Sequence, residues 1–531
     1  MAAGPQAGQS NVCPDIYARF AVDAREPGDS ASRAIRMTAP VQLPVFHVVG
    51  FTGHRRLADP VAAERVLHQV LDELRAQSGV EWLALSSVAE GADMLFARTA
   101  LKLGIGWEAV LPLPPAEFRA DFSPDVWWRV EALLAEAEHA RVIGERSHRD
   151  DAYLDCGMET VNHCDLLLTF WNGEPSRGRG GTADIVAYAR NLGRPLIIID
   201  AMTLTVRREN FARLQTGDRY LAFFNRLPPA PPLPPAPPAA PEPDAERALM
   251  LEFHRKVDHA ATRSAPHFKR LQSLVVGLFV LSSCQAAAAH TFGLDLPWSQ
   301  LLCLLIAVGV AFVVLQRRLQ HDWMRCRLTA EITRSALATW GLPRALRLFD
   351  DFEWAGIEPL RRSLDVLQRR AVRKHPAGFD EFRQRYLTER IDGQLAYFAA
   401  QERRTKPFML CLRAGLFLSS TLAICFTAAY AEHRLLPGLV APAWVHSWIY
   451  EFGLMVLPVF SAGFIALFAI HDFHRRAARC YEMRVRLETA RKEATLVRTW
   501  GALERVVIKA ERALLQEVFE WHSITSFADS R

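Results

Sequence analysis

The sequence lacks the residue spacings that mark metal sites and disulfide frameworks. Its nine cysteines form no Cys-x-x-Cys pair and have no zinc-site spacing. Several lie inside apolar runs, where cysteine behaves as a small hydrophobic residue. We therefore expect a reducing compartment and no metal site. Residues 1–43 contain no apolar segment of the kind found in secretory signals, so we expect a disordered lead-in there.

Several signatures of catalysis are also missing. The chain has no Gly-x-x-x-x-Gly-Lys-Ser/Thr phosphate loop, no Gly-x-Ser-x-Gly elbow and no His-Glu-x-x-His pair. ATP hydrolysis, acyl transfer and zinc proteolysis thus lack their usual motifs. Neither sign of charge predominates, because 63 Lys+Arg against 58 Asp+Glu leave a net charge of only +5. That balance argues against a nucleic-acid partner.

The first half of the chain alternates apolar runs with amphipathic helical patterns. Five runs have the length of strands, at residues 45–49, 82–85, 109–111, 165–170 and 195–199. Apolar strands that alternate with helices are typical of a parallel sheet covered on both faces. We therefore predict an α/β, Rossmann-like domain over residues 44–227. Ligands of such sheets bind beyond the carboxyl ends of the strands.

A proline-rich segment, residues 228–243, is expected to be a semi-rigid linker. Beyond it, four apolar stretches reach or approach the ~18–20 residues that cross a bilayer as a helix. They cover residues 271–291, 298–315, 408–430 and 448–470. Buried core helices of a soluble bundle are the alternative. Basic residues flank only one end of each stretch, which predicts a multi-pass protein of the inner membrane with both termini cytoplasmic.

The membrane half repeats itself. Residues 277–283 are echoed by residues 415–420, and Met-Arg-x-Arg-Leu at Met324–Leu328 recurs at Met483–Leu487. Thr-Trp-Gly follows both copies of that motif. Three echoes in the same order predict a duplication. We expect a first hairpin with its exit helix over 244–345, a helical connector over 346–400 and a second hairpin over 401–531, all in an all-α membrane domain.

Glycine-containing turns follow three of the predicted strands. Glycine allows close backbone approach, helix N-termini attract anions, and Arg or His adds cationic donors. One such turn can be merely a tight connection, but three at one sheet edge predict a nucleotide-type pocket. His54 could be a general base or only a turn hydrogen-bonder. The candidate ligand-binding residues are Gly50, Thr52, Gly53, His54, Arg55, Ser86, Glu90, Gly91, Asp93, Arg179, Gly180, Gly181, Thr182 and Asp184.

These turns, together with the Asp121-Phe122 pair, resemble the SLOG superfamily, the Rossmann-like domains related to LOG and DprA proteins. The resemblance covers roughly residues 44–200. The second half resembles tandem SLATT domains, each with two membrane helices and a cytoplasmic helix, and Gln394–Phe398 resembles an entry segment of those domains. The resemblance implies a homo-oligomeric effector of a bacterial antiphage system, which senses a nucleotide or nucleotide second messenger and permeabilises the bilayer.

LOG enzymes instead cleave an N-glycosidic bond with a Pro-Gly-Gly-x-Gly-Thr-x-x-Glu motif. Here the position that matches the catalytic Glu is Ile185, and Asp184 precedes it by one residue. One helical residue is a turn of about 100°, so binding without catalysis and without a resident cofactor is expected. A membrane-anchored nucleotide N-glycosidase, with Asp184 or Glu90 as the acid–base group, and a scaffold remain alternatives. The span residues Ser282, Ser283, Gln285, Ser419 and Ser420 either line a pore or hydrogen-bond between helices.

Overall fold

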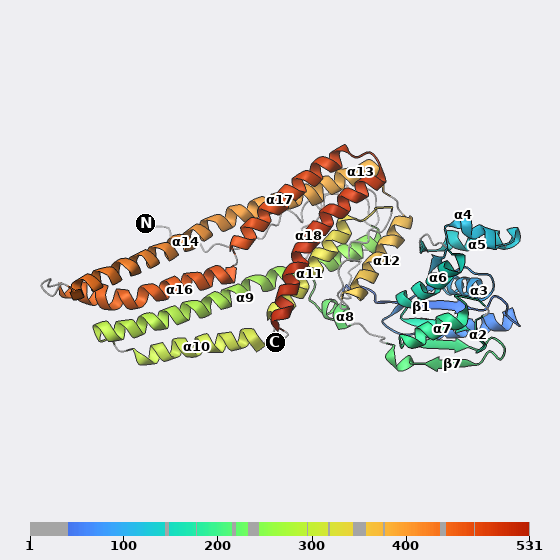
Figure 1. Ribbon diagram of the computed structural model, residues 1–531, viewed down its shortest axis with the longest axis horizontal. Coiled ribbons are helices and arrows are strands. Elements are labelled where there is room, and N and C mark those ends of the chain that lie inside the picture. Colours follow the sequence, from blue (N-terminus) through green and yellow to red (C-terminus); the bar gives the residue numbers. More distant parts are fainter. Residues whose placement is uncertain are drawn as a thin grey trace, which may run out of the picture.

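Most of the chain is described by the structure, a computed structural model (Figure 1). It covers residues 41–143, 148–176, 178–214, 219–231, 244–294, 296–316, 319–343, 357–374, 377–435, 442–471 and 473–529. The lead-in expected before Val41 and the linker residues 232–243 lie outside this range. Leu43 already belongs to the folded body, because its side chain is buried and its amide and carbonyl both bond to the Asn225 side chain.

The first half contains a seven-stranded sheet with the order β4-β3-β2-β1-β5-β6-β7. All neighbouring strands pair in parallel except β6 and β7, which are antiparallel. The predicted α/β domain with a mostly parallel sheet is therefore confirmed. The strands are β1 (Phe46–Gly53), β2 (Glu81–Ser86), β3 (Gly106–Leu111), β4 (His139–Val142), β5 (Leu166–Phe170), β6 (Leu196–Ile199) and β7 (Val206–Glu209).

Helices cover both faces of this sheet (Figure 1). Successive strand residues point to opposite faces, so Val49 and Phe51 of β1 pack with α2, α3 and α5, whereas Val48 packs with α6 and α7. The covering helices are α2 (Pro60–Arg75), α3 (Ala92–Lys102), α5 (Pro124–Glu136), α6 (Arg149–His163) and α7 (Thr182–Asn191), with α4 (Pro115–Phe118), η1 (Arg119–Asp121), η2 (Phe211–Arg213) and α8 (Arg219–Asn225) as shorter elements.

The second half is helical. A long helix leads each apolar hairpin, and a helix outside the apolar stretch follows it: α9 packs against α10 and α11, and α14 packs against α16 and α17. The elements are α9 (Ala245–Phe292), α10 (Pro297–Gln316), α11 (Leu319–Ala338), α12 (Glu358–Lys374), α13 (Phe379–Arg385), the π-helix η3 (Tyr386–Asp392), α14 (Gly393–Leu435), α15 (Ala443–Val445), the π-helix η4 (His446–Gly453), α16 (Leu454–His471), α17 (Phe473–Leu496) and α18 (Trp500–Asp529).

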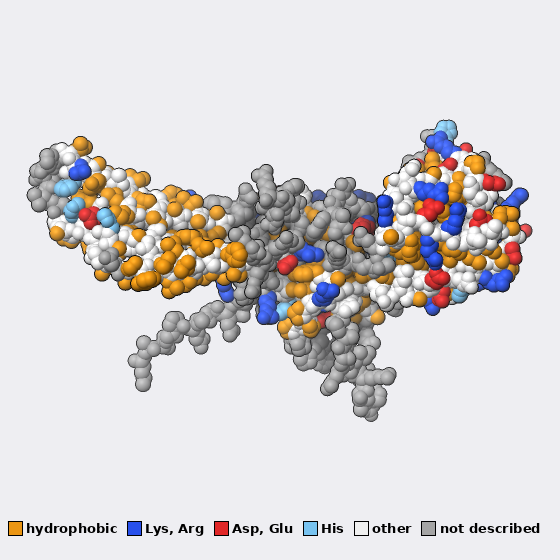
Figure 2. Space-filling view, turned by 90° about the horizontal axis from the view of Figure 1, so that it is seen from below, with side chains coloured by type: hydrophobic (Ala, Val, Ile, Leu, Met, Phe, Trp, Pro, Cys, Tyr) orange, Lys and Arg blue, Asp and Glu red, His pale blue; other side chains and the backbone are white. Residues whose placement is uncertain are grey.

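Four helical stretches are long and apolar enough to cross a membrane. They are Lys269–Phe292, Pro297–Val314, a part of Phe379–Leu435, and Ala443–His471, and they match the four predicted spans. Their side chains are not the core of a soluble bundle: Leu302 and Leu305 of α10 are 57% and 60% exposed. Figure 2 shows the resulting apolar surface along this end of the molecule. Such a surface fits lipid, so this is a membrane protein.

Small residues bring the apolar helices into close contact. A Cβ on Gly415 of α14 would lie 2.5 Å from the Phe464 ring, and a Cβ on Gly463 of α16 would lie 2.9 Å from Val280 of α9. The second contact joins the two hairpins. Close approach at small residues is the usual way membrane helices associate.

The polar residues of the spans bond within the chain. Ser419 and Ser420 both lie within hydrogen-bond distance of Ser461 on α16, at 2.8 and 3.1 Å between hydroxyl oxygens. Gln285 donates to Ser299 at 3.0 Å, and Ser283 donates to the Phe279 carbonyl. Ser282 is buried. Of the two expected roles, hydrogen bonding between or along helices is the one the single chain displays.

Helix α12 joins the two halves. One of its faces buries Leu360, Leu364 and Leu367 in an apolar cluster shared with α9 and α11. Its other face carries four arginines, Arg362, Arg369, Arg370 and Arg373. Their spacing of i, i+7, i+8 and i+11 places them on one side of the helix. The proline-rich segment is therefore not the only connection between the sheet and the membrane helices.

These arginines contact the amino-terminal edge of the sheet. Arg369 pairs with Glu108 of β3 at 2.8 Å, and Arg370 pairs with Glu81 and Glu138 at 2.6 and 3.0 Å. Arg362 pairs with Asp165 and also donates to the Phe46 carbonyl, and Arg373 donates to the last carbonyls of α5. Although burial alone would raise it, His47, Arg362 and the Val48 amide hold the pKa of Asp165 at about 2.

Candidate functional site

The predicted ligand-binding turns lie where the strand order changes direction. β1 lies between β2 and β5, and the chain passes from β1 outward to one side and later returns on the other. In open α/β sheets this switch point, at the carboxyl ends of the strands, is where ligands bind. The turns after β1, β2 and β5 therefore surround the position expected for a ligand.

The turns after β1 and β2 are in direct contact. The Ala92 amide, at the start of α3, donates to the His54 carbonyl at 3.2 Å. Gly91 has φ +100°, and a Cβ there would lie 2.1 Å from the Arg55 carbonyl oxygen. Gly53 is equally confined, since its Cβ would lie 2.7 Å from the Ala92 Cβ. These glycines are required so that the two turns can touch.

Replacing Gly91 with alanine should therefore separate these two turns. The positive φ alone costs a residue with a Cβ on the order of 1–3 kcal/mol, and the contact with the Arg55 carbonyl adds to that cost. We expect a lower free energy of unfolding in denaturant titrations and weaker ligand binding. A Gly79→Ala control has a similarly positive φ but open space around it, so it should show the backbone cost without the loss of binding.

His54 ties the β1 turn to the turn after β5. Its amide donates to the Phe170 carbonyl at 3.3 Å, and its Nε2 lies 3.0 Å from the Asn172 Oδ1. Of the two roles expected for His54, the structure displays the turn hydrogen-bonder. Three separate turns are thereby held together at one point of the sheet edge.

Arg55 is the cation left available at this point. Its side chain is exposed, and its guanidinium makes no hydrogen bond or ion pair with any residue that the structure describes. It lies close enough to Asp93 and to Tyr153 of α6 to interact with them electrostatically. An exposed arginine that pairs with no described residue is well suited to bind a phosphate or carboxylate.

Asp93 is buried near Arg55. It accepts a hydrogen bond from the Ser87 hydroxyl, while its Oδ1 has no partner among the described residues. Burial raises the pKa of Asp93 to about 7, although Ser87, the Gly53 amide and Arg55 act in the opposite direction. A buried carboxyl that titrates near neutrality at a sheet edge is a frequent feature of functional sites.

An Asp93→Asn substitution tests this burial. A carboxyl whose pKa rises from 3.8 to about 7 on folding costs stability as pH rises through that interval. The cost is fully present above about pH 7, where at 1.36 kcal/mol per pKa unit it reaches on the order of 4 kcal/mol. The Asn variant should thus unfold at a higher temperature than the wild type at about pH 8, and at a similar temperature at about pH 4. If the variant and the wild type had equal melting temperatures at both pH values, Asp93 would not be buried as a charge.

A further cluster, which the sequence reasoning did not select, lies on the same side. Asp121 accepts a hydrogen bond from Tyr153 and pairs with Arg149 of α6 at 2.7 Å. Burial and Asp121 raise the pKa of Tyr153 well above its usual value. The Asp121-Phe122 pair was the one sequence signal for this cluster. Tyr153 had none, because it is one aromatic residue in an amphipathic helix.

The charged residues of the third predicted turn, which follows β5, already bond to neighbouring residues of the protein. Asp184 accepts a hydrogen bond from the Gly180 amide at 3.0 Å, and Arg179 pairs with Asp151 of α6 at 3.0 Å. Gly180, with φ +80°, lies against the backbone of Leu154. Asp184 and Arg179 thus shape the entrance to α7 in this structure rather than pointing free charges at a ligand.

Ile185 is buried, and its side chain fills the space beside Gly157 of α6, where a Cβ would lie 2.3 Å away. The position that matches the LOG catalytic Glu therefore belongs to the packing between α6 and α7.

The remaining candidate residues lie within the strands, at the start of α7 or on an exposed turn. Ser86 is buried and accepts a hydrogen bond from the Trp107 indole, and Gly50 lies inside β1, packed against Cys164. Thr52 is within the β1–β5 pairing, opposite Thr169. Gly181 and Thr182 form the start of α7, and Glu90 is exposed beside Gly91. Ser86 and Gly50 are thus part of the strands that carry the turns.

The site itself is small: Arg55 and the nearby Asp93, with the backbone of three turns. Among the described residues, no three His, Cys, Asp or Glu side chains are grouped so that they could hold a metal ion. Neither a protein-family model nor a curated protein matches this chain, so its function is argued from this geometry.

Proposed function

We propose that this protein is a membrane effector that binds a nucleotide-derived anion at the Arg55–Asp93 edge of its sheet and responds by permeabilising the bilayer. The single observation that carries the proposal is the convergence of the turns after β1, β2 and β5 beside an arginine, Arg55, that pairs with no described residue. The resemblance to SLOG and SLATT domains favours a homo-oligomer of the bacterial inner membrane with a role in antiphage defence.

The ligand class follows from the donors available. Arg55 can bind a phosphate through two parallel hydrogen bonds. Glu90, exposed on the neighbouring turn, could accept hydrogen bonds from ribose hydroxyls. This combination suits a nucleotide better than a simple anion.

Helix α12 is the proposed path from the ligand to the membrane. It contacts the amino-terminal edge of β1, β3 and β5 through Pro44, Glu108 and Asp165, and it packs against α9 on its other side. The sheet and the start of the first apolar helix therefore share one apolar cluster. A ligand acts through this path only if it binds two arrangements with different affinity.

The orientation in the membrane is part of the proposal. The α/β domain, α12 and the turn between α17 and α18 all lie beyond the same end of the four apolar stretches (Figure 1). Both ends of the chain are then cytoplasmic, which agrees with the basic residues that flank the stretches on that side.

The nucleotide N-glycosidase is the second candidate, and nothing in the site favours it. Ile185 replaces the acid that the LOG reaction uses, and the Asp184 carboxylate is bonded to the Gly180 amide. We therefore expect binding without release of the base.

The test uses the full chain in liposomes, because the apolar cluster of the α/β domain continues into α9 and α11. Nucleoside mono- and diphosphates and cyclic dinucleotides are added, and binding, free base and dye leakage are measured together. Saturable binding with leakage and no free base supports the proposal. Release of free base would establish the glycosidase, and absence of binding by every probe would reject both functions.

A further inference from the structure

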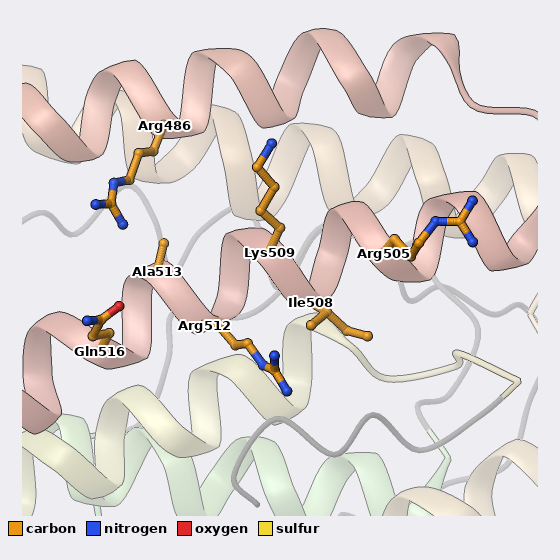
Figure 3. A pocket seen from close by; sticks show the side chains of 7 residues that line it. All are labelled: Arg486, Arg505, Ile508, Lys509, Arg512, Ala513 and Gln516. Carbon is orange, nitrogen blue, oxygen red and sulfur yellow. The ribbon is translucent and has the colours of Figure 1, made fainter. Parts of the chain in front are cut away.

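Two surface cavities lie away from the candidate ligand site, one beside α8 and one between α17 and α18. The second has a volume of about 390 Å³ and is lined mainly by cations (Figure 3). Arg505, Lys509 and Arg512 recur on α18 at i, i+4 and i+7, so they share one face of that helix. In Figure 3, Arg486 extends from α17 toward the end of the cavity at Ala513 and Gln516, and Lys509 points toward α17.

Acidic neighbours pair with two of the four cations that line this cavity, and Arg512 has interactions of its own. Arg486 pairs with Glu482, and Lys509 pairs with Glu493 at 2.7 Å. Arg505 makes no ion pair with a described residue. The buried acid of α18, Glu511, is on the opposite face, where it pairs with Arg390 at 2.6 Å. Gathering like charges in one cleft is unfavourable unless an anion offsets it.

The size and lining of the cavity restrict its occupant. About 390 Å³ is the volume of a small-molecule site. No aromatic side chain is among the described residues that line the cavity, so nucleobases find no surface there on which to stack, as they do in single-strand binding proteins. Ile508 and Ala513 add apolar side chains to the lining, and Gln516 adds an amide. Guanidinium groups around a cavity of this size match the oxygens of phosphate groups.

We propose that the cleft between α17 and α18 is a second binding site, for an anion with more than one phosphate group. Its ligand is either a soluble metabolite or a lipid headgroup. Arg486 follows His471, the end of the last apolar stretch, by 15 residues. At 1.5 Å per helical residue this is at most about 22 Å. The site holds α18 against α17 and so stabilises the helical body that continues from the second hairpin.

The experiment uses the full chain with Arg55→Ala throughout, so that the anion site on the sheet does not contribute. Inorganic tripolyphosphate is titrated calorimetrically into protein in phosphatidylcholine nanodiscs. The test variant is Arg505→Gln with Lys509→Gln, and the control is Lys492→Gln, an exposed cation of α17 outside the cleft. We expect the test variant to bind about tenfold or more weakly and the control to be unchanged.

A second arm identifies a lipid source. Native mass spectrometry counts phosphatidylglycerol retained from mixed nanodiscs, and preferential loss of that lipid in the test variant would assign the cleft to a headgroup. Equal binding of both probes by the test variant and the control would overturn the proposal, since the attraction would then be general. A melting curve for each variant shows that its fold is retained. Failure here leaves the proposed function untouched, because that rests on Arg55.

Discussion

Replacing Arg55 with alanine is expected to weaken nucleotide binding by about 10- to 100-fold. A charge-assisted hydrogen bond contributes about 1.5–3 kcal/mol, and each 1.4 kcal/mol is a factor of ten in affinity. Because the Arg55 side chain is exposed and makes no ion pair with a described residue, its loss should leave the fold intact. Isothermal titration of the full chain in nanodiscs measures the change, and leakage of a trapped dye from liposomes should fall in parallel.

Arg56 supplies the matched control. It is the next residue, it carries the same charge, and it is equally exposed, but it lies one residue beyond the contact with Gly91. Arg56→Ala should bind nucleotide within about twofold of the wild type, which is the range expected for surface changes. Equal losses in both variants would mean that Arg55 contributes only general positive charge.

Reversing two charges of α12 should separate binding from the membrane response. Arg369→Glu with Arg370→Glu places like charges beside Glu108, Glu81 and Glu138, so the helix should leave the edge of the sheet. Nucleotide binding at the opposite edge should change little. Coupling between sites is typically about 1–3 kcal/mol, or about 5- to 150-fold. The ligand-dependent part of dye leakage should therefore fall about fivefold or more.

Arg65→Glu is the control for that experiment, because Arg65 is an exposed cation on α2 and makes no ion pair or hydrogen bond with a described residue of α12. It should leave both binding and leakage unchanged. If the α12 variant responds to ligand as the wild type does, the signal does not pass through this helix. If it also loses binding, the two edges of the sheet are not independent.

The central strands could be predicted because burial on both faces leaves an apolar run. β5 and β6 are of this kind, with Leu166–Phe170 and Leu196–Ile199 entirely buried. β4 and β7 are edge strands with largely exposed side chains, and their sequences, His139–Val142 and Val206–Glu209, include charged or polar residues. A run without apolar periodicity does not distinguish such a strand from a loop. The sheet is wider than its hydrophobic pattern indicates for that reason.

The position of the candidate site could be predicted from the sequence better than the residues that form it. Glycine turns after parallel strands must meet at one edge of the sheet, and in the structure Gly91 lies against the Arg55 backbone. Which charges remain unpaired depends on neighbours from other helices. Arg179 is paired with Asp151, and Asp184 caps its own turn, while Asp93 became the buried carboxyl. Sequence spacing carries no information on such contacts between distant residues.

The largest omission was the contact of α12 with the sheet, since only a helical connector over 346–400 was expected there. The arginines of this helix have the pattern of a solvated helix face, and the acids that they pair with are more than 190 residues away along the chain. Charge pairs across that separation follow from tertiary packing alone. The path proposed between ligand and membrane therefore became visible only in the folded structure.

The central claim, that a phosphate-bearing ligand occupies the Arg55 edge, is tested most directly by the small molecules that leave the purified protein. Full-length protein and its Arg55→Ala variant are prepared side by side from the same cells, denatured, and their released metabolites identified by mass. We predict a nucleotide-derived species that is retained by the wild type and lost from the variant. Identical phosphate-bearing species in both preparations would contradict the claim.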